Sequence, residues 1–175
     1  MAKKNKRFPI VLVEGETEKA LIDDFKRKHK DPIKRIIKLN LWLGDVNKVL
    51  ISLTEQNDII VVFDTDAKDG FDTFHKNIKA ILARKHNVFL LQQTNNFENE
   101  LTYACKCTEN TLFSLFCKKI KSCDNFKASF LKSKTRLEML ESLGFKKDLL
   151  WQRGLISELL KLNYQASSYN NILDS

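Results

Sequence analysis

The sequence predicts an α/β fold: a four-stranded parallel sheet with helices on both faces, followed by a helical flank on the C-terminal side. Four apolar runs of strand length alternate with three segments of helical periodicity. These runs are nearly continuously apolar, as strands covered on both faces must be. After residue 96 the alternation stops, and the regular segments have helical periodicity. A length of 175 residues suits one domain with an extension.

The first part of the chain supplies the sheet. We expect strands at 8–13, 33–42, 59–63 and 88–91, and helices at 16–28, 46–55 and 71–85. Gly15 ends the first strand, and Thr17 can cap the helix that follows. Asp31-Pro32 and Gly44-Asp45 are turn signals on either side of the second strand. Right-handed crossovers between parallel strands then place helices on both faces of the sheet.

The second part of the chain is expected to be helical. Helices are predicted at 97–107, 109–121, 126–132, 135–143 and 149–162. Thr108 and Asp124 are candidate N-caps, and Gly144 is a candidate C-terminal stop. The tail from Gln165 to Ser175 is polar and expected to fray, apart from Ile172-Leu173. The predicted organisation is a basic tail (1–7), an α/β core (8–96) and a helical extension packed on it (97–175).

The composition of the chain indicates which partners and which compartment to expect. The formal net charge is +8 and the pI about 9.3, which suits a polyanion such as nucleic acid but also general solubility. We find no apolar run near 18 residues and no signal peptide, so we expect no membrane contact and a cytoplasmic location. The four cysteines (Cys105, Cys107, Cys117 and Cys123) lack the paired spacing of zinc ribbons, so reduced thiols are expected.

Acidic residues end two of the expected strands. Glu14 follows the first strand, and Asp64 and Asp66 follow the third. The carboxyl ends of parallel strands share one edge of a sheet, so these acids converge if the two strands are neighbours. Closely packed carboxylates repel one another, and a divalent cation removes that cost. Oxygen ligands favour Mg²⁺ or Mn²⁺. The alternative interpretation is a set of solvated acids at strand ends.

These acids resemble the motifs of a known family. Glu14-Gly15, Glu18 four residues after Glu14, and Asp64-Thr65-Asp66 followed by Gly70 are similar to the TOPRIM domain. That Rossmann-like domain is shared by topoisomerases, bacterial primases, ribosomal-RNA maturation nucleases and the OLD (overcoming lysogenization defect) nucleases of phage defence. The resemblance spans about residues 8–100, and the second glutamate brings it closest to the OLD nucleases. The spacing from Asp64 to Gly70 is looser than in several TOPRIM branches.

The resemblance implies a metal site and a catalytic lysine. It assigns two metal ions to five acids: Glu14, Glu18, Asp64, Asp66 and Glu98. Glu14 is also the candidate bridging ligand or general base. A lysine some thirty to forty residues after the last acid falls at Lys132 or Lys134, and we favour Lys134 as the catalytic group. As alternatives, Glu18 and Glu98 could each be an exposed acid in a first helical turn, and Lys134 a solvated lysine.

The functional expectation is a Mg²⁺- or Mn²⁺-dependent endonuclease or nickase that hydrolyses phosphodiesters with two metals, with a role in anti-phage defence. DNA is favoured over RNA as the substrate. OLD proteins usually carry an ATPase domain ahead of the TOPRIM domain, so a separate ATPase subunit is an expected partner, and a homodimer is compatible with the resemblance. Two alternatives stay open: a non-catalytic TOPRIM-like subunit that binds nucleic acid or an ATPase, and an RNA-maturation nuclease.

Overall fold

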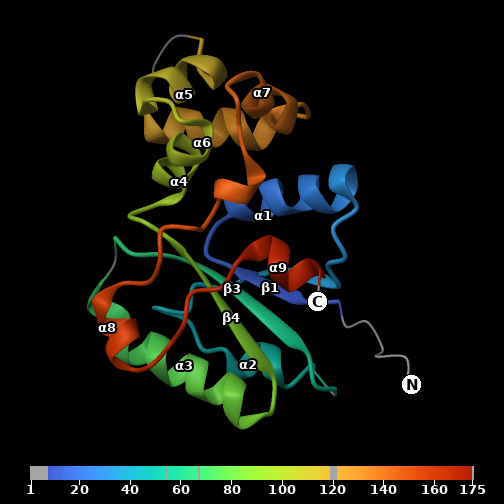
Figure 1. Cartoon of the computed structure of the whole chain (residues 1–175), viewed down its shortest axis with the longest axis vertical. Coiled ribbons are helices and arrows are strands. Elements are labelled where there is room, and N and C mark those ends of the chain that lie inside the picture. The colour runs from blue at the N-terminus through green and yellow to red at the C-terminus, as the bar shows by residue number, and fades with distance from the viewer. Residues whose placement is uncertain (1–7, 54, 67, 119–121, 175) are drawn as a thin grey trace.

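The sheet is parallel and has four strands, as predicted. The computed structural model describes residues 8–53, 55–66, 68–118 and 122–174, so the predicted basic tail lies outside the described residues. The strands are β1 (Ile10–Val13), β2 (Arg35–Lys38), β3 (Asp58–Asp64) and β4 (Asn87–Gln93). Their order is β2-β1-β3-β4 (Figure 1). Leu12 pairs with Ile37 on one side and Val61 on the other, so β1 and β3 end side by side.

Helices cover both faces of the sheet. Alternate strand residues point to opposite faces, so Val11 and Val62 join one buried cluster and Leu12 and Val61 the other. The first cluster lies under α1 (Glu16–Asp24), which continues as a π-helical turn, η1 (Phe25–His29). The second lies under α2 (Asn47–Leu50) and α3 (Phe71–Ala83), the latter preceded by a short 3₁₀ turn, η2 (Lys68–Gly70).

The second strand and the helix after it are shorter than predicted. The strand ends at Lys38 because the chain turns at Asn40, whose side-chain oxygen accepts the Trp42 N–H at 2.8 Å. This turn buries the Trp42 ring, which stacks on Phe74 with centroids 4.4 Å apart. Gly70 is required nearby, since a Cβ there would overlap the carbonyl oxygen of Trp42. Burial of one tryptophan therefore decides where β2 stops.

The helical half contains α4 (Phe97–Cys105), α5 (Glu109–Phe116), α6 (Cys123–Lys132), α7 (Arg136–Ser142) and a 3₁₀ turn, η3 (Lys147–Leu149). Figure 1 groups α4 to α7 beyond α1 and away from α2 and α3. Thr108 caps α5 as predicted. The predicted cap Asp124 is wrong: α6 starts earlier, and its cap is Ser122, whose hydroxyl accepts the Asn125 N–H at 3.3 Å. Gly144 follows α7 with a φ of +80°, as a helix stop requires.

The predicted helix at 149–162 is wrong over its first half. Leu150 is extended, and a helix resumes only at α8 (Ser157–Lys161). Two core side chains take the backbone donors that a helix would use. The carboxylate of Glu100 accepts the Trp151 N–H, and the amide oxygen of Gln92 accepts the Ile156 N–H, both at 2.6 Å. Tertiary hydrogen bonds therefore override helical periodicity here.

The expectation of a frayed tail is also wrong. Ala166 forms a parallel bridge with Leu90 of β4, and the chain then forms α9 (Tyr169–Asp174). Tyr169 is 1% exposed, and its hydroxyl donates to Asp31 at 2.9 Å. One buried cluster joins side chains of β1, α1, α4, α6 and α9, so the sheet and the helical half share a core. The division at residue 96 stays a prediction.

Within the described segments, no helix combines the length and apolar character needed to cross a bilayer.

Candidate functional site

Two of the predicted acids meet at the carboxyl edge of the sheet. Glu14 directly follows β1, and Asp64 is the last residue of β3. The backbone N–H of Asp64 donates to Oε1 of Glu14 at 3.3 Å, so the acids touch although 50 residues separate them. The other oxygen of Glu14 accepts from the Asn40 amide at 3.1 Å. The parallel pairing of β1 with β3 therefore brings Glu14 and Asp64 together, as the acids at the strand ends predicted.

Glu18 reaches the same edge from the first turn of α1. It is 3% exposed, so the alternative of an exposed helix acid is wrong. Gly15 holds the N-cap position, and the hydroxyl of Thr17, the predicted cap, instead donates to Oε2 of Glu18 at 3.0 Å. A Cβ at position 15 would lie 2.6 Å from that same oxygen. The glycine after β1 thus leaves room for the second glutamate.

Glu98 approaches from the first turn of α4 and is 1% exposed. Its Oε1 accepts from the Cys123 thiol at 3.3 Å and lies 3.5 Å from Nζ of Lys127. Its Oε2 is buried and has no hydrogen-bond partner among the described residues. A buried carboxylate oxygen without a partner costs free energy, so this atom is suited to receive a ligand.

Neutral groups hold the remaining oxygens. With its amide oriented so that the NH₂ group faces the acceptors, Gln93 places its nitrogen 2.5 Å from Oδ1 of Asp64 and 3.3 Å from Oε1 of Glu18. The Trp42 indole donates to the backbone carbonyl of Asp64 at 3.0 Å. Among the salt bridges of the described residues, one involves these four acids, and it joins Lys127 to Glu98. The cluster is therefore not neutralised by lysine and arginine.

These side chains surround an open pocket of about 290 Å³. Its lining includes three of the acids, the amide that holds one of them, and two residues of α6: Glu14, Glu18, Asp64, Asn40, Lys127 and Leu131. We call this the acidic pocket and count Glu98 with it, because Glu98 binds Lys127 and repels both Glu18 and Asp64. Its carboxylates come from four places in the chain: the residue after β1, α1, the end of β3 and α4.

The electrostatics of the acidic pocket favour bound protons when no cation is present. Burial raises the pKa of Asp64 to about 9, and repulsion from Glu18 and Glu14 adds to the shift. Burial also raises the pKa of Glu14 to about 7, although the Asp64 N–H opposes the change. The pKa of Glu18 is raised by burial too, with a contribution from Glu98. At neutral pH the Asp64 carboxyl is protonated, so a cation would have to displace a proton.

Besides Glu98, which adjoins the pocket through Lys127, two predicted site residues lie outside this lining. Asp66 is exposed, two residues beyond β3, although its charge still contributes to raising the pKa of Glu14 and of Asp64. Lys134 is exposed in the turn between α6 and α7, and its alternative Lys132 is exposed at the end of α6. The structure places neither lysine among the residues that line the pocket.

Lys127 is the functional candidate that sequence reasoning missed. Burial lowers the pKa of Lys127, but the combined effects of Glu98, Cys123 and Glu18 outweigh it, so the pKa is raised. Counting residues along the chain from Glu98 leads to Lys134, whereas the lysine that reaches the pocket depends on which face of α6 packs inward. Phe126 and Phe130 mark that face, and Lys127 lies at its border. Helical periodicity around these phenylalanines was the available signal.

The carboxylate oxygens of the acidic pocket are suitable ligands for a hard cation, although they do not converge on one point. Within the described residues, no three acidic, histidine or cysteine side chains stand at the spacing that a bound ion needs. Side-chain rotation would therefore have to accompany binding. The partnerless oxygen of Glu98 and the carboxylates of Glu14 and Asp64 supply oxygen ligands of the kind that Mg²⁺ and Mn²⁺ prefer.

Comparisons of the chain with protein-family models, with curated proteins and with solved structures returned no match. The family resemblance therefore rests on the residues of the acidic pocket and their spacing.

Proposed function

We propose that the chain is a Mg²⁺- or Mn²⁺-dependent nuclease of the TOPRIM type that cleaves phosphodiesters as an endonuclease or nickase. The observation that carries this proposal is the acidic pocket: Glu14, Glu18 and Asp64 line one open space, and Glu98 is joined to it by Lys127, which also lines the pocket. A structural cluster would satisfy each oxygen internally, whereas Oε2 of Glu98 is left over.

Glu14, Glu18, Asp64 and Glu98 would hold the cations, with Asp66 available at the rim. When bound, divalent cations activate water and neutralise charge on a phosphodiester. Glu14 supports a second role. Its pKa of about 7 suits a group that takes a proton from an attacking water near neutral pH, and Asn40 fixes its carboxylate.

Lys127 replaces Lys134 as our candidate for the catalytic lysine. Its ammonium group lies at the acidic pocket on the helix that packs against α1, where it can stabilise charge that develops on phosphoryl oxygens. Because Glu98 already holds this group in place, little reorganisation is needed during the reaction.

The substrate we propose is DNA in preference to RNA. A net charge of +8 supports a polyanionic substrate, because each neutralised phosphate releases counterions. A role in phage defence and a separate ATPase partner rest on the OLD resemblance alone. The four cysteines are free thiols, which fits the reducing conditions of the cytoplasm, where we place the activity.

The test is a cleavage assay. The purified chain is incubated with supercoiled plasmid or structured RNA in Mg²⁺, Mn²⁺ or EDTA. We expect metal-dependent nicking that Glu14→Gln and Asp64→Asn reduce at least about 100-fold. Asp58→Asn is the matched control, because Asp58 begins the strand that Asp64 ends. Equal cleavage by the Asp58 and Asp64 variants would contradict the assignment.

A second candidate is a non-catalytic subunit that binds nucleic acid or an ATPase. The observation that favours it is the spacing of the carboxylates, which are not gathered around a single point within the described residues. The same assay separates the two functions. Binding of plasmid without cleavage in any metal, unchanged in Glu14→Gln, would support the subunit.

A further inference from the structure

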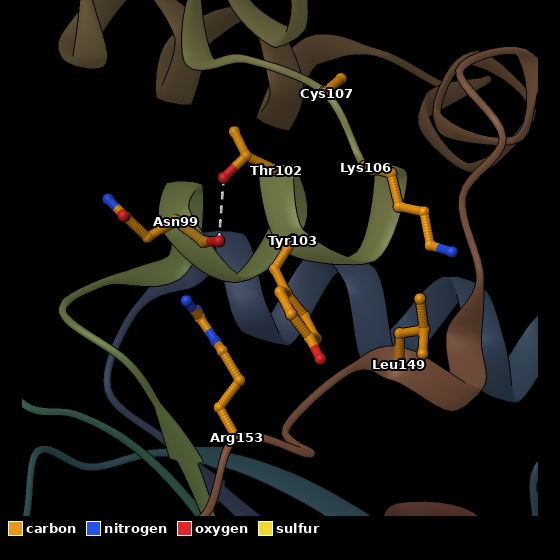
Figure 2. A pocket seen from close by; sticks show the side chains of 7 residues that line it. All are labelled: Asn99, Thr102, Tyr103, Lys106, Cys107, Leu149 and Arg153. Atoms are coloured by element: carbon orange, nitrogen blue, oxygen red, sulfur yellow. Dashed lines mark hydrogen bonds between the residues drawn. The ribbon is translucent and has the colours of Figure 1, made fainter.

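A second pocket lies along α4, on the side where the chain returns toward the sheet. It measures about 460 Å³, and its walls include Asn99, Tyr103 and Lys106 of the α4 segment together with Leu149 and Arg153 (Figure 2). We call it the tyrosine pocket. None of these residues belongs to the acidic pocket, and the proposed hydrolysis does not use them.

Tyr103 packs against Arg153 while much of it stays accessible. Its side chain is 42% exposed, and the guanidinium carbon of Arg153 lies 4.8 Å from its ring centroid. Arg153 is itself fixed, since its Nη2 binds Oε2 of fully buried Glu100 at 2.6 Å. Figure 2 shows the ring between Arg153 and Leu149. A supported aromatic ring with accessible area is the kind of surface on which nucleic-acid bases stack.

The charge of the tyrosine pocket is positive. Glu100 balances Arg153, so the remaining charge is that of Lys106. Lys106 directly follows α4 with a left-handed backbone, φ 51°, and is exposed. Within the described parts of the chain, no salt bridge involves Lys106. Its ammonium group is therefore free to contact an anion beside the ring, while Asn99 adds an amide to the wall.

We propose that the tyrosine pocket binds one nucleotide unit, with its base against Tyr103 and its phosphate against Lys106. A free nucleotide and a unit of a single strand share this chemistry. Binding of a single-strand unit would extend the proposed function and rests on it. The two pockets would then contact one strand, because Glu98 of the acidic pocket lies on the same helix. Lys106 follows Glu98 by eight residues along α4 and its C-cap, about 12 Å at 1.5 Å per residue.

The test measures binding in EDTA, where cleavage cannot contribute. Fluorescence anisotropy follows a labelled oligothymidylate, and thymidine monophosphate and inorganic phosphate compete with it. We expect Tyr103→Ala to weaken oligonucleotide binding about 5- to 150-fold, the loss of one stacked base, and Tyr103→Phe to retain it. Leu82→Ala on α3 removes another exposed apolar side chain and serves as the control.

Lys106→Asn provides an independent arm if Tyr103→Ala fails to fold. Asparagine tolerates the left-handed backbone of this position but removes the charge. Its matched control is Lys85→Asn, because exposed Lys85 also follows a helix with a left-handed backbone, φ 62°. We expect the Lys106 variant alone to bind more weakly and to lower the salt dependence by about one charge.

Each outcome decides the matter. Competition by the monophosphate that depends on Tyr103 assigns a free nucleotide, and Tyr103-dependent binding of the oligonucleotide alone assigns a strand contact. Binding that responds equally to each variant and its control would overturn the proposal. So would competition by inorganic phosphate that matches the monophosphate and ignores Tyr103. Failure of the nuclease proposal is separate, because it appears as absent cleavage while Tyr103-dependent binding persists.

Discussion

Glu98 and Glu100 lie two residues apart on α4, and both are almost completely buried, yet their environments differ. Both oxygens of Glu100 are satisfied: Oε1 accepts the Trp151 N–H, and Oε2 accepts from Arg153 and from the Thr94 N–H. Oε2 of Glu98 has no partner within the described residues. Burial alone therefore does not separate a structural acid from a functional one, but the number of satisfied oxygens does.

The same contrast extends to the two regions that these glutamates serve. On the helical side, buried Asp24 is paired with Arg136, and buried Asp31 with Lys147. At the carboxyl edge of the sheet, Glu14 and Asp64 are held by amide and backbone N–H groups instead. The two ion pairs of the first region connect α1 and the turn after η1 to the chain beyond α6. In the second region Glu14 and Asp64 have no cationic partner among the described residues, so a bound cation could neutralise them.

The largest expected effect is the loss of stability on replacing Glu100, the acid whose oxygens are both satisfied. Glu100→Gln leaves the partly buried Arg153 without its counter-charge, so we expect the free energy of unfolding to fall by about 3 kcal/mol. Glu98→Gln should cost less than about 1 kcal/mol without metal, since it removes an unsatisfied oxygen's charge. Urea denaturation in EDTA measures both. Equal losses in the two variants would remove the distinction between these acids.

The next effect concerns the lysine. Lys127→Met should lower the rate of cleavage about 100-fold at saturating metal, because the positive charge at the acidic pocket is lost. Lys134→Met is the control and should cleave as the wild type does, since Lys134 is exposed away from the pocket lining. The measurement is the single-turnover rate at which supercoiled plasmid is nicked. A reversed order would restore Lys134 as the catalytic residue.

Stability without metal should decrease as the pH rises. The pKa of Asp64 is raised to about 9, so between its usual value near 4 and about pH 9 the folded protein binds more protons than the unfolded chain. Stability is then highest on the acid side of this range and falls toward pH 9. Each kcal/mol lost lowers the Tm by about 2–4 °C for a chain of this size. Calorimetry across this range in EDTA should find a weaker slope in Asp64→Asn.

The smallest expected effect is on Mg²⁺ affinity, when a residue that holds the acids in place is replaced. Gln93 bridges Asp64 and Glu18, so Gln93→Met should weaken Mg²⁺ binding about tenfold without unfolding the sheet. Gln92→Met is the control, because Gln92 instead accepts the Ile156 N–H on the path to α8. Titration calorimetry with Mg²⁺ compares them. If both variants bound the ion like the wild type, Gln93 would have no part in shaping the site.

Much of the sheet and its acidic edge could be predicted from sequence because both depend on local patterns. Apolar runs fix the strands, and acids at the ends of β1 and β3 follow them to one edge. The helical half was harder. Trp151 is not helical, and its N–H is instead accepted by Glu100, 51 residues away. Lys127 reaches the pocket through the packing of α6, which spacing along the chain does not reveal.

Electron paramagnetic resonance of Mn²⁺ at neutral pH measures whether the acids at the edge of the sheet bind a divalent cation. We expect wild type and Asp58→Asn to bind Mn²⁺ alike, and Asp64→Asn and Glu98→Gln to bind it at least about tenfold more weakly. Mn²⁺ binding that is absent from the wild type, or unchanged in the Asp64 and Glu98 variants, would contradict this expectation.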